Sequence, residues 1–312
     1  MKAYANDETI KKVVVIGGGY IGIELVEAFN RSKKEVTLID LVTRPVPRYF
    51  DVEFTDKLVE DMKAHGVKTA FGERFLKFEG KNGKVSKVIT DKNSYDADLV
   101  IMAIGFAPNT SLLPNAKKIQ NGALIVDEYM RTSITDIYAI GDCVAIPYAP
   151  TGQPANIALA TNAVRTGLVA AHHIANPKSD LKLPSIVGTN GIYVFDNRLA
   201  ATGMSEEAAK LAGMDVLSST FEDNDRPEFM NDEGLERVKC KMVYDAKTRK
   251  LLGAQIGSYG KTNHSEAIFY LALAIDKGMT IEQVAIVDLY FLPHYNKPLN
   301  YLLQTALNAP RQ

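Results

Sequence analysis

A glycine-rich turn near the N-terminus constrains the fold more than any other feature of this sequence. It follows residues 13–16, a β-branched run typical of a strand buried on both faces of a parallel sheet. The turn spans residues 17–22, and apolar residues then recur at helical spacing at Ile21, Leu25, Ala28 and Phe29. A second predicted strand over residues 35–40 ends in an acid. This succession predicts an α/β fold with a parallel sheet.

The spacing inside the turn suits one kind of ligand. Gly17 permits a tight turn, Gly19 lets a pyrophosphate approach the backbone, and Gly22 lets the helix pack closely on the strand. The helix N-terminus offers N–H groups and the positive end of its dipole to phosphates. Asp40 lies 18 residues beyond Gly22, close to where an acid accepts the ribose hydroxyls of NAD. The pattern therefore predicts a dinucleotide-binding site.

The acid also bears on which coenzyme is bound. A carboxylate at Asp40 repels the additional phosphate of NADP, so the sequence favours NADH. Arg44 and Arg48 lie just downstream, and their positive charges would soften that preference.

The rest of the first domain follows from local patterns. Asp51 is expected to cap a helix that bears Phe54, Leu58 and Met62. Further strands are predicted over residues 67–71 and 99–104, with a type I′ hairpin over 75–90 around Asn82 and Gly83. We expect a nucleotide-binding domain over residues 12–112, preceded by a linker tail at 1–11.

The second region, residues 113–182, carries one candidate ligand acid. Residues 132–142 predict a strand that delivers Gly141 and Asp142 at its carboxyl end, where open sheets bind ligands. From the chemistry alone, Asp142 is either a ligand of a hydroxyl-rich linker or a solvated turn acid. Helical spacing over residues 157–175 predicts a helix whose first turn presents N–H groups to an electron-rich ring edge.

The third region, residues 183–312, has a different pattern. Apolar residues at 238, 240 and 242 alternate with lysines, which predicts a half-buried antiparallel strand paired with residues 251–256. A helix is expected over residues 265–277, and Thr280 and Gln283 form a predicted capping box. The aromatic, proline-broken segment 289–298 is typical of either a core or a buried interface.

Composition excludes several function classes. Lys and Arg total 36 against 37 Asp and Glu, so no strong field directs the chain to nucleic acid or to an anionic membrane. No apolar run is long enough to span a bilayer, and no signal-peptide core is present, so we expect a cytoplasmic location. The five histidines show no ligand spacing, so no metal site is predicted, and His172 and His173 are expected at a solvated helix end.

The order of the motifs identifies a family. VVVIGGGYIGIELVEAF, LID, MAIGFAPNT, TSITDIYAIGDC, NIALATNAVRTG, GTNGIYVFD and YFLPHYNKPLNYL together resemble the NADH oxidase, NADH peroxidase and coenzyme A disulfide reductase group of the pyridine nucleotide-disulfide oxidoreductases. The resemblance runs from about residue 10 to residue 308, and it is greatest to the water-forming NADH oxidases. It implies a Rossmann-like NAD domain inserted in an FAD domain, followed by an α+β dimerisation domain that builds a homodimer.

The resemblance also implies roles for individual residues. The positions that match NAD contacts in the family are Ile21, Asp40, Tyr49, Gly105, Ala158 and Gly191. Asp142 matches the acid that binds the ribityl and pyrophosphate region of FAD, and Ala160 and Thr161 match the helix start near the flavin ring. Tyr20 matches a tyrosine that covers the flavin until nicotinamide displaces it. His294 and Tyr295 lie in a segment that reaches toward the partner subunit's active site in relatives.

One departure from the family pattern limits the expected chemistry. In the family, a first glycine-rich motif for FAD and a redox cysteine precede the NAD domain by many residues, whereas here eleven residues do. Cys143 and Cys240 do not match that nucleophile by position, and both are expected to be small core residues. The chain therefore resembles a C-terminal fragment with a complete NAD domain, part of an FAD domain over 113–182 and a complete interface domain over 183–312.

Three functions follow as expectations. The first is an NADH oxidase-like enzyme that moves hydride from NADH to FAD and then to oxygen, with no acid–base side chain required for the hydride transfer itself. The second is a catalytically inactive module that binds NAD and dimerises. The third keeps the scaffold but reduces a coenzyme A disulfide or a peroxide. None of the three involves nucleic acid or a membrane.

Overall fold

The computed structural model describes residues 1–230 and 234–310, and the chain divides into two compact units. The first unit comprises Met1–Gly105, Ile192–Leu199 and Tyr259–Thr262. The second unit comprises Phe106–Gly191, Ala200–Ser258 and Asn263–Gln312. Among the helices of the described residues, none has the length and apolar character needed to cross a membrane.

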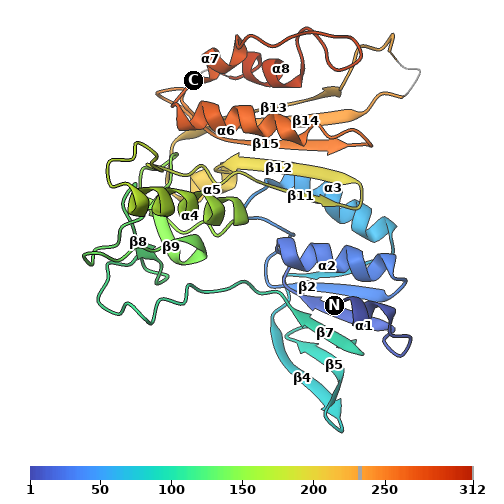
Figure 1. The fold of residues 1–312 in the computed structure, drawn as a ribbon. Helices are drawn as coiled ribbons and strands as arrows, with labels where there is room; N and C mark the ends of the chain where they lie inside the picture. The colour runs from blue at the N-terminus through green and yellow to red at the C-terminus, as the bar shows by residue number, and fades with distance from the viewer. Residues whose placement is uncertain (231–233, 311–312) are drawn as a thin grey trace. The chain divides into compact units, whose positions relative to one another are not determined.

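The first unit is built on a four-stranded parallel sheet (Figure 1). Its strand order is β3-β2-β1-β7, with β1 at Lys12–Ile16, β2 at Glu35–Asp40, β3 at Lys68–Phe71 and β7 at Leu99–Met102. Helix α2, Tyr20–Arg31, packs on β1 and β2, and helix α3, Val52–Ala64, packs on β3. The predicted parallel α/β architecture is confirmed.

Local signals placed α3 and the hairpin over residues 75–90 correctly, whereas β7 ends at Met102, two residues before the end of the strand predicted over 99–104. Asp51 occupies the N-cap position of α3, although its side chain accepts no cap hydrogen bond, and Phe54, Leu58 and Met62 of that helix are fully buried. Strands β4, Phe75–Lys81, and β5, Lys84–Thr90, form the expected hairpin, with β6, Ser94–Asp96, beside β5. Asn82 and Gly83 have φ of 52° and 75°, as a type I′ turn requires.

Two parts of the first unit differ from expectation. Residues 2–6 form helix α1, Lys2–Asn6, and Ile10 is buried, where a linker tail was expected. The N–H groups of Lys11 and Lys12 donate to Asp98 at 2.9 and 2.8 Å, which fixes this segment to the unit. The buried face of α2 consists of Gly22, Ile23, Val26 and Phe29, whereas Ile21 is 58% exposed.

The second unit contains a small sheet in the order β10-β9-β8. These strands are β8 at Leu124–Ile125, β9 at Val144–Pro147 and β10 at Pro154–Ala155. A 3-10 turn, η1, occupies Gly141–Cys143, and helix α4 spans Ala160–Ala175, three residues shorter at its start than expected. Leu124, Ile146 and Val169 belong to one buried core cluster that joins β8, β9 and α4.

Two expectations for this region are wrong. The structure places no strand within residues 132–140: the N–H groups of Thr132 and Ala139 bond to Ile137 and Met130 nearby, and Arg131 and Tyr138 form only an isolated bridge. A β-strand needs a neighbouring strand that hydrogen-bonds along its whole length, and the local hydrogen bonds of residues 130–139 do not provide one. His173 is buried: its Nδ1 lies 2.8 Å from the Tyr138 hydroxyl, and its ring lies against the Tyr129 ring at an angle of 33°. His172 is exposed.

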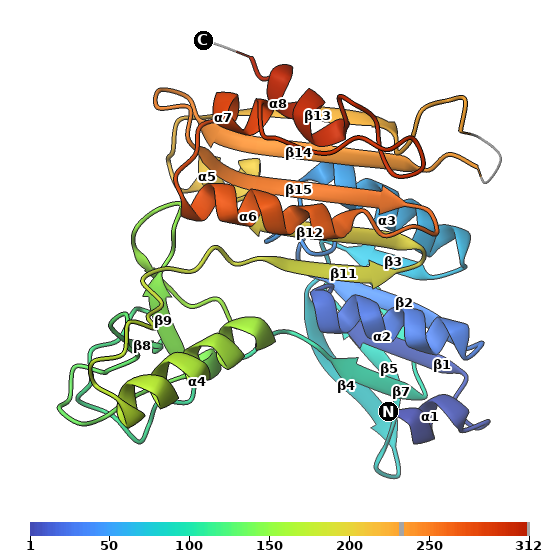
Figure 2. The same ribbon diagram turned by 45° about the horizontal axis from the view of Figure 1, so that its top comes forward.

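A five-stranded sheet follows in the order β11-β12-β15-β14-β13 (Figure 2). Its strands are β11 at Asn190–Val194, β12 at Asn197–Gly203, β13 at Val216–Asn224, β14 at Arg237–Asp245 and β15 at Leu251–Tyr259. The associated helices are α5 at Glu206–Leu211, η2 at Ser265–Ala267, α6 at Ile268–Asp276, α7 at Ile281–Ala285 and α8 at Tyr301–Leu307. The Thr280–Gln283 capping box is confirmed by reciprocal bonds of 3.3 and 2.9 Å.

Strand β14 is buried on both faces, not on one as its alternation predicts. Val238, Cys240 and Met242 share a core cluster with α6, α7 and α8. On the opposite face, Val243 clusters with Ala209 of α5, and Lys241 is only 3% exposed. The Lys241 Nζ lies 2.8 Å from Glu206 Oε2, so the α5 carboxylate supplies the charge that allows this lysine to be buried.

Candidate functional site

The glycine turn lies at the junction of β1 and α2, and two of its glycines have no room for a side chain. Gly17 has φ of 106°, and a Cβ there would lie 2.4 Å from the Ala103 carbonyl oxygen. A Cβ at Gly22 would lie 1.8 Å from the Gly17 carbonyl oxygen. These contacts correspond to the tight turn and the close helix–strand packing that the sequence predicts.

Gly19 has the opposite environment. No heavy atom lies within 4 Å of a Cβ built there, so the backbone faces open space. Gly19 is also the N-cap of α2, which has no side-chain cap and no acidic residue in its first turn. The first N–H groups of the twelve-residue helix therefore face a space that a phosphate can enter. The positive end of the helix dipole lies on the same side and favours a negatively charged group there.

Asp40 points at this turn from the end of β2. Its Oδ2 accepts a hydrogen bond from the Gly18 N–H at 2.5 Å, and its Oδ1 accepts one from the Val42 N–H at 3.1 Å. The residue is half-buried, and each carboxylate oxygen can accept a further bond. The predicted acid thus lies where the turn and the second strand meet.

The two downstream arginines make specific contacts in this loop. Arg44 Nη1 donates to the Phe50 carbonyl oxygen at 2.5 Å. The Arg48 guanidinium lies 5.8 Å from the centroid of the Tyr49 ring. Arg44 is therefore anchored on the loop backbone, while Arg48 contacts an aromatic ring.

Tyr20 and Tyr49 form a stacked pair beside the turn. Their ring centroids are 4.8 Å apart and their planes differ by 3°, and Phe50 packs edge-on against Tyr20. Burial raises the pKa of the Tyr20 hydroxyl well above its usual value, so this group stays protonated at neutral pH. Ile21 and Gly105 are both exposed in the same unit, and Gly105 has φ of 91°.

The remaining candidate residues lie in the second unit. Gly141 has φ of 79° and donates from its N–H to Thr166 Oγ1 at 3.0 Å, which ties η1 to α4. Asp142 is exposed, and its carbonyl oxygen accepts from Asn156 Nδ2 at 2.8 Å. Ala160 and Thr161 begin α4, whose N-terminus has no side-chain cap. The hydrogen bond to Thr166 thus places η1, which contains Asp142, against α4.

The candidate residues therefore fall into two groups. The first unit holds Gly17, Gly19, Tyr20, Ile21, Gly22, Asp40, Tyr49 and Gly105, and the second unit holds Asp142, Ala158, Ala160, Thr161 and Gly191. Gly191 lies in β11 and is exposed, and Ala158 is half-buried just before α4.

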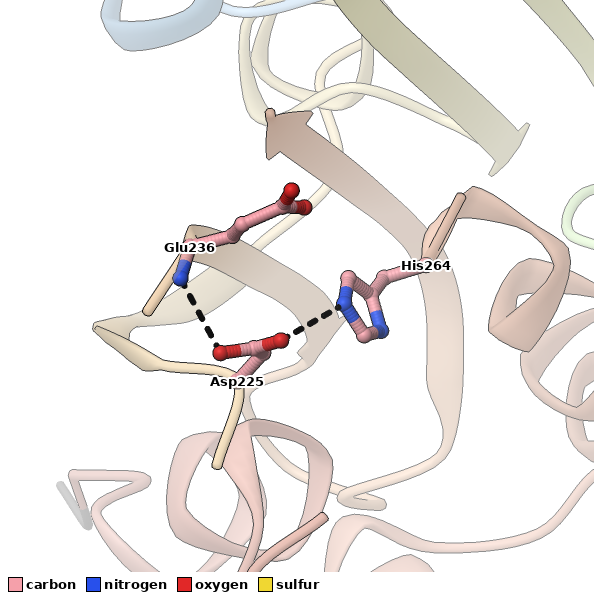
Figure 3. Close-up of side chains that lie close together, drawn as sticks. All are labelled: Asp225, Glu236 and His264. Atoms are coloured by element: carbon pink, nitrogen blue, oxygen red, sulfur yellow. Dashed lines mark hydrogen bonds and ion pairs between the residues drawn. The ribbon is translucent and has the colours of Figure 1, made fainter. Parts of the chain in front are cut away.

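Within the described residues, sequence reasoning missed one group of side chains that could ligate a metal ion. Asp225, Glu236 and His264 lie together in the second unit, with one potential ligand atom from each within 4.8 Å of the others (Figure 3). They are separated by 11 and 28 residues, so no short motif marks them. The pairing of Asn224 with Arg237 between β13 and β14 brings the first two together.

Family models cover most of the chain. The model described as pyridine nucleotide-disulphide oxidoreductase matches residues 1–167. The chain belongs to this family. The dimerisation domain of the same family matches residues 189–300. The two matches agree with the expected α/β fold class and with the expected order, in which a dimerisation domain follows a Rossmann-like domain.

Several relatives of this chain are named NADH oxidases. The chain is 48% identical over 313 residues to the NADH oxidase of Mycoplasma genitalium and 45% identical over 309 residues to that of Streptococcus pyogenes. Both alignments cover 98% of this chain, but only 65% and 66% of the relatives. The solved water-forming NADH oxidase from Lactobacillus brevis, bound to NADH, is 39% identical with a TM-score of 0.92, over 98% of this chain and 66% of that one. The chain thus spans about two thirds of the length of these relatives.

Proposed function

We propose that the first unit of this oxidoreductase binds NADH at the carboxyl ends of β1 and β2. The observation that carries the proposal is the contrast within the turn, where Gly17 and Gly22 admit no Cβ and Gly19 opens onto free space. The pyrophosphate would accept hydrogen bonds from N–H groups at the start of α2, and Asp40 would accept them from a ribose hydroxyl. Tyr20, Ile21, Tyr49 and Gly105 are proposed as further contacts.

The second unit fits part of a flavin site. Asp142 is exposed in η1, which a hydrogen bond from the Gly141 N–H to Thr166 Oγ1 ties to α4, and the N-terminus of α4 has no side-chain cap. We propose that Asp142, Ala160 and Thr161 contact FAD, which when bound supplies the hydride acceptor for NADH. Ala158 and Gly191 are proposed to contact NADH. The proposed domain limits remain 12–112, 113–182 and 183–312.

For the whole protein we propose an FAD-dependent NADH oxidase-like activity with oxygen as the final acceptor. The names of the relatives support this choice over a coenzyme A disulfide or peroxide acceptor, which remain alternatives. A homodimer is proposed from the dimerisation model and from the exposure of Tyr290 and Tyr295, at 71% and 61%, in the aromatic segment. A cytoplasmic location stays a prediction.

The cysteines favour a second candidate, namely NADH binding without turnover. Burial raises the pKa of the Cys240 thiol to about 12, although a hydrogen bond with Thr305 opposes this shift. The Cys143 Sγ donates to the Ile140 carbonyl oxygen at 3.3 Å. The thiolate is the reactive form of cysteine. Because its pKa is raised, the Cys240 thiol stays protonated at neutral pH and is therefore unreactive. Chemistry that needs a redox cysteine is therefore not proposed for these two residues.

One experiment separates the two candidates. NADH fluorescence is titrated with the purified chain, and NADH consumption is then followed with oxygen uptake, with and without added FAD. Saturable binding with oxidation supports the oxidase, and saturable binding without oxidation supports the binding module. Asp40→Asn should weaken binding, while Asp56→Asn, an exposed acid on α3, serves as a matched control. Absence of saturable binding would contradict both candidates.

A further inference from the structure

Three side chains of different chemistry converge at one end of the β13–β14 pair. Asp225 follows β13 directly, Glu236 precedes β14 directly, and His264 immediately precedes η2. Figure 3 shows the Asp225 carboxylate facing the His264 ring, with the Glu236 side chain beside them. Each residue has a ligand atom within 4.8 Å of the other two.

The backbone holds the two acids in a fixed relation. The Asp225 N–H donates to the Glu236 carbonyl oxygen at 2.8 Å, and the Glu236 N–H donates to Asp225 Oδ1 at 3.0 Å. Asp225 is only 3% exposed, and Glu236 is half-buried. The other carboxylate oxygen, Asp225 Oδ2, accepts a hydrogen bond from Arg226 Nε and lies 3.4 Å from His264 Nε2.

His264 presents a nitrogen that needs a partner. Within residues 1–230 and 234–310, its buried Nε2 makes no hydrogen bond of acceptable geometry, and 3.4 Å is too long for a good N–H···O contact. Burial lowers the pKa of this imidazole, with Asp225 opposing the shift. A buried polar atom without a hydrogen bond is costly, and a ligand on Nε2 would remove that cost.

The separation of the donors fits a small ion. Ligands about 2.0–2.1 Å from a tetrahedral metal lie roughly 3.3 Å from one another. The Asp225 Oδ2 to His264 Nε2 distance of 3.4 Å already has this value. A movement of about 1.5 Å or less by the Glu236 carboxylate would complete a three-donor face.

The net charge of the three side chains and Arg226 indicates which class of metal ion fits the cluster. Arg226 Nε lies 3.1 Å from Asp225 Oδ2 and offsets part of the negative charge of the cluster. The remaining negative charge is modest, which disfavours Ca²⁺ and Mg²⁺, ions held mainly by several charged or carbonyl oxygens. An imidazole with two carboxylates suits Zn²⁺ and neighbouring transition metals.

We propose that Asp225, Glu236 and His264 bind one divalent transition-metal ion of the zinc class, with water completing its coordination. Bound there, the ion joins both ends of the segment between β13 and β14 to the segment that leads into η2. Its role is structural, and the proposal is independent of the proposed NADH function.

The test uses the whole chain after treatment with a chelator. Calorimetric titration with ZnCl₂ should give one saturable site per chain, and MgCl₂ and CaCl₂ should bind at least tenfold more weakly. CoCl₂ should give visible d–d absorption bands that Zn²⁺ abolishes. Glu236→Gln and His264→Gln should each weaken Zn²⁺ binding more than tenfold, whereas the exposed controls Glu60→Gln and His172→Gln should not.

Folding is checked independently of binding. Glu236 is half-buried and its Gln variant keeps the backbone bonds to Asp225, so it should remain folded by circular dichroism even where a His264 variant does not. Zn²⁺ should raise the Tm of the wild-type chain and leave that of Glu236→Gln unchanged. The proposal is overturned if the wild-type chain shows no stoichiometric Zn²⁺ site, if Glu236→Gln binds like wild type, or if Ca²⁺ and Mg²⁺ bind as tightly.

Discussion

The Asp40 carboxylate accepts a hydrogen bond from the Gly18 N–H at 2.5 Å, so the acid both holds the glycine turn and faces the proposed coenzyme site. Asp40→Asn keeps an acceptor oxygen but removes the charge. We expect NADH affinity to fall by about 1.5 kcal/mol, roughly tenfold, because bonds to a charged acceptor are the stronger ones. NADPH affinity should rise relative to NADH, since repulsion of the additional phosphate is lost. Parallel fluorescence titrations check both changes, and an unchanged ratio of the two affinities would contradict the assignment.

Gly19 and Gly22 form a matched pair for separating binding from folding. Gly22→Ala places a methyl group 1.8 Å from the Gly17 carbonyl oxygen and should destabilise the chain by about 1–3 kcal/mol. Gly19→Ala meets no atom within 4 Å, so stability should change by less than about 0.5 kcal/mol. Its Cβ would nevertheless occupy the phosphate approach and weaken NADH binding. Denaturant melts and NADH titrations of both variants check this, and a Gly19→Ala protein with wild-type affinity would argue against phosphate binding there.

Glu206 should make the free energy of unfolding depend on pH in the acidic range. Burial alone would raise its pKa, but hydrogen bonds from Lys210, Lys241 and Ser218 lower the pKa from 4.5 to about 2. Because the folded pKa lies below the unfolded one, this contribution is complete above pH 4.5 and is lost as pH falls toward 2. It amounts to about 1–2 kcal/mol after allowance for solvent screening.

Unfolding free energies between pH 6 and pH 2 measure that contribution. Glu206→Gln should flatten the profile below pH 4.5 and lower stability at neutral pH, because Lys241 is then buried without a full counter-charge. The double variant Glu206→Gln with Lys241→Met should recover part of the loss. Equal acid sensitivity in wild type and Glu206→Gln would show that other carboxylates dominate.

The two cysteines should differ in reactivity. Cys240 is fully buried with its pKa raised to about 12, so it should resist alkylation at pH 7.5 while the chain is folded. Cys143 is partly exposed and should be labelled first. Mass spectrometry after timed iodoacetamide treatment checks the order, with a denatured sample as the control for complete labelling. Preferential labelling of Cys240 would be incompatible with its position in the core.

The β1-turn-α2-β2 unit could be predicted from the sequence because its determinants are local. Strand, turn and acid are set by residues 13–40, and Gly17, Gly22 and Asp40 occupy the predicted positions. The Asn82–Gly83 turn and the Thr280 cap are local in the same sense. Which residues bind a ligand stays a prediction.

The failures all involve partners distant in sequence. Residues 132–140 have strand composition, but no neighbour pairs along them in the described chain. Lys241 lies on an apparently exposed face until α5 covers it with Glu206. His173 is buried by Tyr129 and Tyr138, and Asp225 approaches His264 only through the sheet. Periodicity within one segment carries no information about which other segment will pack on it.

The steric closure of the turn has a practical consequence for protein engineering. Since Gly17 and Gly22 are fixed by contacts with the chain's own backbone, a mutant library that includes them would consist largely of misfolded variants. Randomising the exposed residues 41–43 and 48 while conserving both glycines and the buried Val46 would vary the charge and shape around the proposed adenosine end with little disturbance of the scaffold. Coenzyme preference and foldability are therefore separable traits in this chain, open to independent selection.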